Sequence, residues 1–387
     1  MAEASLIVAL IGFILIAGAF LKHSSQKRGY PLTLILLLLG ILLGPITGIF
    51  TPGAAENQVA VTSFITLALI LVLFDTGSQI KIRSLFRNFA GPTMFGLLSV
   101  LLTIGIVAVP FKFLLGLDWI LAILFGSFLA STDLTILGPV LSNIKLKPKI
   151  LEYLELESTL NTVISAVLVI VLVNLIESPV TAKATTIIGE GLQTLLYHIF
   201  VGVGLGVLFG FLILWSIRHM TLEELPHIIM IGALFASYAI TEILGASGIA
   251  TALAVGMVFG NSKYKLPNII KSFGGELELI LVTFVYVILG AIIDFTILKS
   301  VIVLALILIA AVYLARYGAL RVTNKENTKY NRFYLISSPR GITCAVLTLS
   351  YANLFPDPTA IIGLVFGVIL VSSLSLFGIT KTLPRRS

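Results

Sequence analysis

The chain has 387 residues, of which 58% are hydrophobic and only 11% are charged, and its mean hydropathy is +1.10. Soluble globular domains carry about 25% charged residues, so the composition excludes an ordinary water-soluble domain. Cys344 is the only cysteine and therefore excludes an internal disulfide.

Apolar runs of about 17 to 25 residues recur from one end of the chain to the other, and each is long enough to cross a bilayer. The first run follows an acidic start without a cleavage site, which indicates a spanning helix and not a signal peptide. In chain order the thirteen predicted spans are Ser5–Leu21, Pro31–Gly48, Val59–Ser78, Met94–Leu114, Trp119–Val140, Leu151–Ile176, Leu192–Ile217, Ile228–Leu244, Ile249–Gly260 (which, being short, is expected to begin nearer Gly245), Leu277–Ile293, Leu298–Val322, Phe333–Leu349 and Ile361–Ile379. The sequence thus predicts an all-α membrane protein of about 13 transmembrane helices, organised as one domain over residues 1–387.

The basic residues predict how these spans are oriented. Most of the 25 lysines and arginines follow odd-numbered spans, whereas the connections after even-numbered spans hold only Lys112, Lys183 and Lys299. Basic loops stay in the cytoplasm, so the N-terminus is expected outside and the C-terminus in the cytoplasm. The net charge of +7 is then a topology signal, and a nucleic-acid-binding face is not expected. Neither a phosphate-binding loop nor a cluster of metal ligands is evident, which argues against a pump driven by ATP.

Four ionisable side chains lie deep within apolar segments. Asp133 and Glu157 are the deep acids, with Asp75 nearer a boundary, and Arg316 and Arg340 are the deep bases. Each such group costs roughly 2.5–3.5 kcal/mol on insertion scales and marks a functional site by default. Because an unpaired buried charge is the expensive case, the near balance of signs predicts pairing.

The first polar cluster is Ala-Ser-Thr-Asp-Leu-Thr at residues 130–135. Small and hydroxylated residues beside an acid allow a membrane helix to unwind, which frees carbonyl and hydroxyl oxygens to bind a cation at mid-membrane. The alternative is a continuous helix in which the hydroxyls bond back to their own carbonyls and Asp133 caps a neighbour. The acid favours the binding site.

The second cluster is a polar stripe on one helix face. Glu157, Asn161 and Ser165 are spaced i, i+4 and i+8, with Ser158 and Thr162 beside them. Such a stripe could simply hold membrane helices together. The full negative charge of Glu157 favours a site.

The third cluster is Ser-Ser-Pro-Arg-Gly-Ile-Thr at residues 337–343. Proline removes a backbone donor and glycine is permissive, so the helix is expected to break here. This break lies seven helices after the first, which predicts an inverted repeat whose fifth and twelfth helices are both broken. Arg340 could neutralise the carbonyl ends at the break, or it could pair with an acid.

Taken in this order, the clusters resemble the cation/proton antiporter superfamily, particularly its sodium/proton exchanger branch, which includes archaeal Na⁺/H⁺ antiporters. The similarity covers essentially the whole chain. It is carried by Tyr30-Pro31 through Leu43-Gly44-Pro45, Leu73-Phe74-Asp75-Thr76-Gly77, Ser131-Thr132-Asp133, Glu157-Ser158-x-x-Asn161, the Gly-rich stretch from Gly245 to Gly260, Leu314-Ala315-Arg316 and Pro339-Arg340-Gly341.

The resemblance implies a fold of two inverted repeats with broken crossing helices. It assigns residues 91–178 and 297–387 to an ion-binding core, residues 1–90 and 226–296 to a dimerisation domain, and residues 179–225 to a linker helix. It also implies a homodimer in the plasma membrane whose core moves like an elevator. No cofactor is expected besides the transported ions.

The resemblance further implies roles for individual residues. Thr132, Asp133 and Ser158 would bind the monovalent cation, together with Asn161 and the position that follows it. Glu157 would form a buried ion pair with Arg316, with Arg340 as the second candidate.

The position after Asn161 departs from the family pattern, because Thr162 stands where an Asp is expected. A threonine hydroxyl can coordinate a cation but cannot exchange a proton near neutral pH. Either Asp133 carries the exchange, or the chain exchanges poorly, or this residue has been altered.

The function predicted is antiport of Na⁺, Li⁺ or K⁺ against protons, with pH homeostasis as its purpose. The alternative is a transport-deficient cation-binding or regulatory protein of the same fold. A membrane enzyme is disfavoured, because no nucleophile and base stand together.

Overall fold

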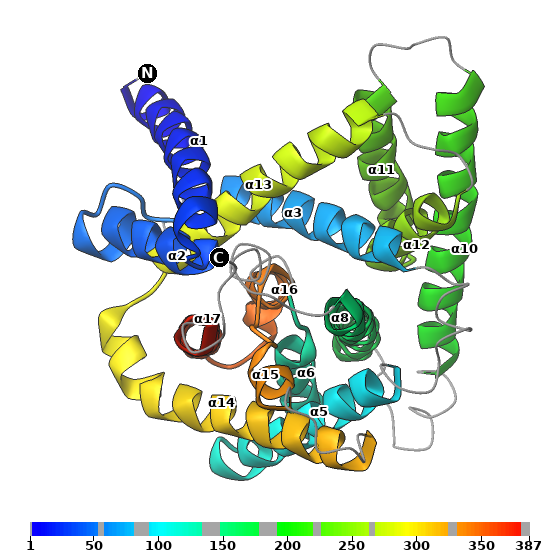
Figure 1. Ribbon diagram of the computed structural model, residues 1–387. Helices are drawn as coiled ribbons and strands as arrows, with labels where there is room; N and C mark the ends of the chain where they lie inside the picture. Colours follow the sequence, from blue (N-terminus) through cyan, green and yellow to red (C-terminus); the bar gives the residue numbers. More distant parts are fainter. Residues whose placement is uncertain are drawn as a thin grey trace.

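The computed structural model describes residues 2–52, 58–80, 93–133, 148–177, 192–219, 226–262, 268–323 and 331–380. Within these ranges the regular structure is helical, without a β-strand (Figure 1). Seven of the described helices are long and apolar enough to cross a membrane, and six shorter helices are also apolar. The prediction of an all-α, multi-pass membrane protein is therefore confirmed.

The helices succeed one another in the order of the predicted spans. They are α1 (Ala2–Arg28), α2 (Leu32–Ile41) with a π-helical turn at Leu42–Ile46, α3 (Gln58–Gln79), α5 (Met94–Leu114), α6 (Trp119–Ala130), α8 (Pro148–Glu177), α10 (Leu192–His219), α11 (Pro226–Ile243), α12 (Gly248–Asn261), α13 (Asn268–Ala291), α14 (Phe295–Thr323), α15 (Asn331–Ile336), α16 (Ile342–Tyr351) with a 3₁₀ turn at Ala352–Leu354, and α17 (Pro358–Thr380).

Three predicted helix ends outside the polar clusters need correction. The tenth predicted span does not begin at Leu277, because α13 begins at Asn268. The first helix does not end at Leu21 but continues to Arg28, because its basic last turn suits the negative C-terminal end of a helix and Gly29, at φ +72°, ends it. The ninth helix does not begin near Gly245, which lies in a turn at φ +70°. It begins at Gly248, where the Ser247 side chain caps it by accepting a hydrogen bond from the Ala250 N–H.

The helices form two groups in Figure 1, with α1 to α3 and α10 to α13 in the upper and right part of the view and α5, α6, α8 and α14 to α17 in the lower part. Within the first group, α2 and α13 touch backbone to backbone. A Cβ atom on Gly40 would lie 2.3 Å from the carbonyl oxygen of Val287, and one on Gly290 would lie 2.4 Å from that of Leu37. Small residues allow such close approach between membrane helices.

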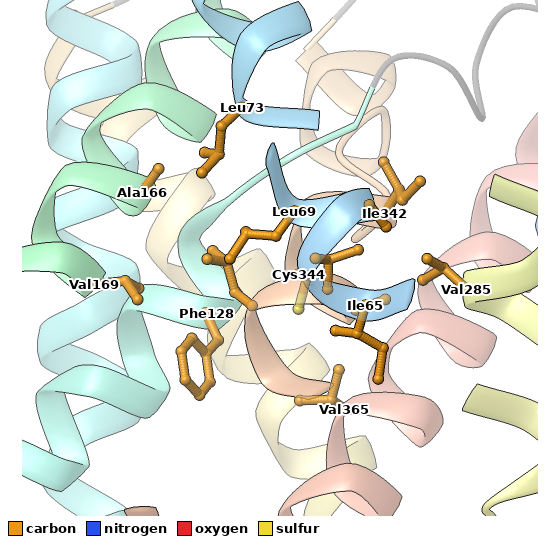
Figure 2. Packing of buried hydrophobic residues seen from close by; sticks show 14 of the residues in the cluster. Ile65, Leu69, Leu73, Phe128, Ala166, Val169, Val285, Ile342, Cys344 and Val365 are labelled. Atoms are coloured by element: carbon orange, nitrogen blue, oxygen red, sulfur yellow. The ribbon is translucent and has the colours of Figure 1, made fainter. Parts of the chain in front are cut away.

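An apolar contact joins the two groups. Ile65, Leu69 and Leu73 on α3 belong to the same buried cluster as Phe128 of α6 and Cys344 of α16 (Figure 2). The polar crossing described next lies at the ends of α6 and α16, so this apolar layer places it inside the molecule.

Candidate cation-binding site

The fifth predicted span is broken where the polar cluster begins. Helix α6 ends at Ala130, and Ser131 is extended, with φ −64° and ψ 142°. A continuous helix through residues 131–133 is thereby ruled out, while residues 134–140 of the predicted span lie outside the described ranges. The break leaves the last carbonyl groups of α6 without helical partners, which other groups must satisfy.

The twelfth predicted span is also broken. Residues 337–341 are irregular between α15 and α16, at the Pro-Arg-Gly motif. The two breaks touch directly, since the Asp133 N–H donates to the Pro339 carbonyl oxygen at 3.1 Å. The unwound segments therefore cross at one point.

Asp133 serves as a cap for α16. Its Oδ2 accepts a hydrogen bond of 2.8 Å from the Ile342 N–H, at the helix N-terminus, where negative charge is favourable. Gly341 makes this approach possible, because a Cβ atom there would lie 2.0 Å from Asp133 Oδ2. Asp133 is 7% exposed, so the carboxylate is held almost fully away from water.

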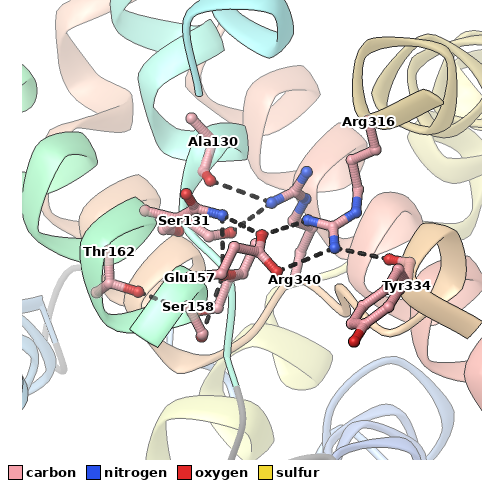
Figure 3. Close-up of polar contacts among 10 residues, drawn as sticks. Ala130, Ser131, Glu157, Ser158, Thr162, Arg316, Tyr334 and Arg340 are labelled. Carbon is pink, nitrogen blue, oxygen red and sulfur yellow. Dashed lines mark hydrogen bonds and ion pairs between the residues drawn. The ribbon is translucent and has the colours of Figure 1, made fainter. Parts of the chain in front are cut away.

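Arg340 performs the opposite task at the C-terminal end of α6. Its Nη1 donates to the carbonyl oxygens of Ala130 at 3.1 Å and Ser131 at 2.8 Å (Figure 3). Its backbone N–H donates to the Ser372 hydroxyl at 3.2 Å. A buried positive charge thus meets the negative end of a broken helix. The sequence left open whether Arg340 neutralises the carbonyl ends at the break or pairs with an acid, and the structure shows it in contact with the carbonyl ends.

The oxygen atoms of Thr132 meet two hydroxyls of α8. The Thr132 carbonyl oxygen accepts hydrogen bonds from Thr162 Oγ1 at 2.7 Å and from Ser158 Oγ at 3.1 Å. Thr132 Oγ1 lies 3.1 Å from Ser158 Oγ and 3.4 Å from Asn161 Nδ2. All four side chains are buried. The extended segment and the polar face of α8 therefore form one cluster of oxygen atoms beside Asp133, of the kind that monovalent cations bind.

Glu157 and Arg316 form a buried, two-pronged ion pair. Arg316 Nη1 lies 2.5 Å from Glu157 Oε1, and Nη2 lies 3.1 Å from Oε2 (Figure 3). Asn161 Nδ2 donates to Glu157 Oε1 at 2.6 Å. The structure thus places Arg316, and not Arg340, against this acid. Both carboxylate oxygens of Glu157 accept hydrogen bonds from Arg316 or Asn161, whereas Asp133 lies where the two unwound segments cross.

Several contacts around these residues could not be read from the sequence. Arg316 also donates to the Tyr334 carbonyl oxygen at 2.7 Å and stacks over the Phe95 ring at 5.1 Å. The hydroxyl of Ser165, on the predicted polar stripe, donates to the Ser127 carbonyl oxygen and so ties α8 to α6. The polar stripe in the sequence includes Ser165, so this residue could be predicted. The contact with Tyr334 could not, because every residue has a backbone carbonyl.

The remaining predicted acid, Asp75, lies on an exposed part of α3 and accepts a hydrogen bond from Gln79 Nε2 at 2.6 Å. Among the described residues, no three His, Cys, Asp or Glu side chains gather as ligands for a tightly bound metal ion. The cluster around Thr132 is made of hydroxyl and carbonyl oxygens.

Comparisons with known proteins identify the family of this chain. The sequence model of the family described as "Sodium/hydrogen exchanger, transmembrane" matches residues 10–382. The Na⁺/H⁺ antiporter 1 of Methanocaldococcus jannaschii is 24% identical in an alignment of 368 positions that covers 90% of this chain and 84% of that protein. The K⁺/H⁺ antiporter NhaP of Alkalimonas amylolytica is 27% identical over 270 residues, which are 69% of this chain but only 45% of that protein.

A solved structure has the same fold. The sodium proton antiporter MjNhaP1 of M. jannaschii, determined at pH 8, superposes with a TM-score of 0.78 at 21% identity, covering 98% of this chain and all of that one. This likeness establishes the antiporter fold for the chain.

Proposed function

Because this chain belongs to the sodium/hydrogen exchanger family, we propose that it exchanges a monovalent cation for protons across a membrane. The observation that carries the proposal is the crossing of two broken helices, where the Asp133 carboxylate accepts from the Ile342 N–H and the carbonyl oxygen of the preceding residue, Thr132, accepts from the Ser158 and Thr162 hydroxyls. Sites of this construction lie near the bilayer midplane in transporters and bind ions through freed backbone groups.

The proposed mechanism is competition at Asp133. The cation binds its carboxylate and the neighbouring oxygens, and a proton binds the same carboxylate when the cation has left. Glu157 is held by Arg316 and Asn161, so it takes a structural role. The site then carries either a cation or a proton, which couples the two fluxes.

The loaded site must face each side of the membrane in turn. We assign residues 91–178 and 297–387 to a moving core, residues 1–90 and 226–296 to a dimerisation domain that stays fixed, and residues 179–225 to the linker. The apolar layer between α3 and α16 supports this division, because apolar surfaces slide without breaking hydrogen bonds. We further propose a homodimer in the plasma membrane, with the N-terminus outside and the C-terminus in the cytoplasm, as the distribution of basic residues predicts.

This activity requires no chemical catalysis. The family consists of transporters, and gradients of the transported ions supply the driving force. No enzymatic role and no cofactor is proposed for the chain.

One observation favours a second function. Thr162 donates to the Thr132 carbonyl oxygen at 2.7 Å, so a hydroxyl satisfies this oxygen before any cation arrives. A chain whose site is satisfied in this way could bind cations without exchanging them. It would then act as a cation-binding or regulatory protein of the same fold.

Proton flux in proteoliposomes separates the two functions. The purified chain is reconstituted into proteoliposomes with a pH gradient across the vesicle membrane. K⁺, Na⁺ or Li⁺ is then added outside while the internal pH is measured. An antiporter dissipates the gradient upon cation addition, and Asp133→Asn abolishes the response. The matched control is Asp118→Asn, since Asp118 lies at the start of α6 with its side chain 88% exposed. Full flux in Asp133→Asn would show that the exchange site has been misplaced.

A further inference from the structure

We propose that the site prefers potassium over sodium and lithium, and that Thr162 sets this preference. The inference rests on the proposed function, because it names the cation for the same site. It follows from the charge of the ligands, from the net charge of the crossing and from the hydrogen bonds that occupy the site.

The ligands at the crossing are mostly neutral. The Thr132 carbonyl oxygen and the hydroxyls of Ser158 and Thr162 carry partial charges only, and Asp133 supplies a carboxylate. The other buried acid that the structure places here, Glu157, has both oxygens engaged by Arg316. Among the buried groups that the structure describes here, Asp133 is therefore the acid left to meet the cation, and the exposed Asp75 of α3 interacts with it electrostatically from a distance.

The four buried charges of this crossing already balance without a cation. Asp133 and Glu157 carry two negative charges, and Arg316 and Arg340 carry two positive charges, all on side chains at most 7% exposed. A bound monovalent cation leaves an excess of one positive charge in a poorly solvated region. A carboxylate at position 162 would cancel that excess, but Thr162 does not.

A weakly charged site favours the larger ion. The Coulomb attraction between an ion and a carboxylate grows as their separation falls. Removing a carboxylate therefore reduces the binding free energy of a small ion more than that of a large one. The small ion also loses more on leaving water, because the desolvation cost of an ion increases as its radius decreases. Lithium and sodium therefore need strongly charged ligands, whereas potassium is satisfied by carbonyl and hydroxyl oxygens, as in channel filters.

Hydrogen bonds already formed at the site work in the same direction. Two hydroxyls donate to the Thr132 carbonyl oxygen, at 2.7 Å from Thr162 and 3.1 Å from Ser158. Both must rotate before their lone pairs and the carbonyl can face a cation. The binding energy left after this rotation is small, so it is the ion that is easiest to dehydrate that binds best.

The test compares three cations on three proteins. The full-length wild-type chain, Thr162→Asp and the neutral isostere Thr162→Asn are purified, and K⁺, Na⁺ and Li⁺ are titrated in two assays. One assay is proton flux in proteoliposomes. The other is the cation-induced rise of Tm in detergent, which reports binding without transport.

For the wild type we expect the apparent affinity for K⁺ to exceed those for Na⁺ and Li⁺ by about tenfold. Thr162→Asp should raise the affinities for Na⁺ and Li⁺ by a larger factor than that for K⁺, whereas Thr162→Asn, with the same shape but no charge, should keep the wild-type order. A wild type that binds Na⁺ or Li⁺ most tightly would overturn the inference, and this outcome stands even if Thr162→Asp fails to fold. Equal gains for all three cations in Thr162→Asp would also overturn the role of Thr162. Binding in the expected order without flux for any cation would instead refute the proposed exchange and leave the preference supported.

Discussion

Asp133 holds two contacts that fix its position at the crossing. Its N–H donates to the Pro339 carbonyl oxygen, and its carboxylate accepts from the Ile342 N–H. In the proposed mechanism, a cation or proton that binds this carboxylate changes the charge that caps α16. The proposal therefore couples binding at Asp133 to the position of α16, on the other side of the crossing.

Gly341 is the residue whose replacement should disturb this coupling most directly. In Gly341→Ala, the new Cβ would fall 2.0 Å from Asp133 Oδ2, so the carboxylate must leave its cap. We expect cation-dependent proton flux to be lost, with a cost in stability of about 1–3 kcal/mol, as is typical of overpacking. Gly105→Ala is the control, since a Cβ there meets nothing within 4 Å. Normal flux in Gly341→Ala would mean that Asp133 does not need its contact with α16.

The sequence predicted the residue types of this crossing better than their partners. Hydroxyls beside an acid and a Pro-Arg-Gly motif are local features, so both breaks could be located from them. Which backbone group Asp133 would meet depends on the packing of segments about 200 residues apart, and no local pattern encodes it. The choice between Arg316 and Arg340 for Glu157 required the structure for the same reason.

At the scale of helices, charged side chains lie at the ends of three half-helices. Arg340 meets the C-terminal carbonyls of α6, Arg316 meets the Tyr334 carbonyl near the end of α15, and Asp133 meets the N-terminus of α16. Each charge has the sign that opposes the helix dipole. These side chains therefore stabilise the broken helix ends inside the membrane.

The Glu157–Arg316 pair links α8 to α14. Its two residues should show a large interaction free energy in a double-mutant cycle that measures the stability of the protein. Either Glu157→Gln or Arg316→Met alone leaves a buried charge without a partner, at a cost on the order of 3–5 kcal/mol. The double variant should lose clearly less than the sum. Thermal unfolding in detergent measures all four proteins. The control cycle uses Lys112 and Asp118, an ion pair at 3.9 Å with side chains 30% and 88% exposed, whose coupling should stay under about 1 kcal/mol. Additive losses for Glu157 and Arg316 would contradict a direct pair.

Asp357 precedes α17 outside the membrane segment and caps it. Hydrogen bonds from the Thr359 hydroxyl at 2.6 Å and the Ala360 N–H at 3.0 Å lower the pKa of Asp357 below its usual range. The cap therefore stabilises the protein fully above about pH 4 and loses this effect as the pH falls through the lowered pKa. Asp357→Ala should cost about 0.5–2 kcal/mol at pH 7 and less at pH 3. Asp357→Asn keeps an oxygen acceptor, so its stability should lack this pH dependence. An Asp357→Ala deficit of equal size at both pH values would exclude the charge as its cause.

Helix boundaries show where sequence patterns end. The span of α5 was predicted to the residue, because a long apolar run fixes both of its ends. The first helix runs seven residues beyond its apolar part, since polar residues continue a helix until a residue such as Gly29 stops it. Hydropathy therefore predicts the part of a helix that crosses the membrane but not the turns beyond it.

The whole molecule joins two groups of helices, and the proposed transport cycle requires them to move relative to each other. Glycines bring α2 and α13 into backbone contact within one group, where a shift would cause clashes. Between the groups, α3 faces α6 and α16 through apolar side chains (Figure 2). The glycine contact between α2 and α13 is suited to holding these two helices in a fixed arrangement. The apolar contact of α3 with α6 and α16 is suited to letting the two groups slide. The order of the described helices followed from the sequence, whereas this difference between contacts depends on which faces meet.

Cross-linking across the two groups tests this movement. The rings of Tyr30, which precedes α2, and Phe377 on α17 lie with centroids 5.2 Å apart, so Tyr30→Cys and Phe377→Cys place two thiols within reach of a short bifunctional reagent. The background is Cys344→Ala, which removes the buried native thiol. Cross-linking should abolish cation-dependent proton flux, because the core can no longer shift, while cation binding in detergent persists. Phe64→Cys with Phe284→Cys is the control pair, since these rings lie 4.8 Å apart within one group, on α3 and α13. Its cross-linked form should transport normally. Undiminished flux through the Tyr30–Phe377 cross-link would show that α17 keeps its place beside the first helices throughout the cycle, and the proposed division into a moving core and a fixed domain would have to be redrawn.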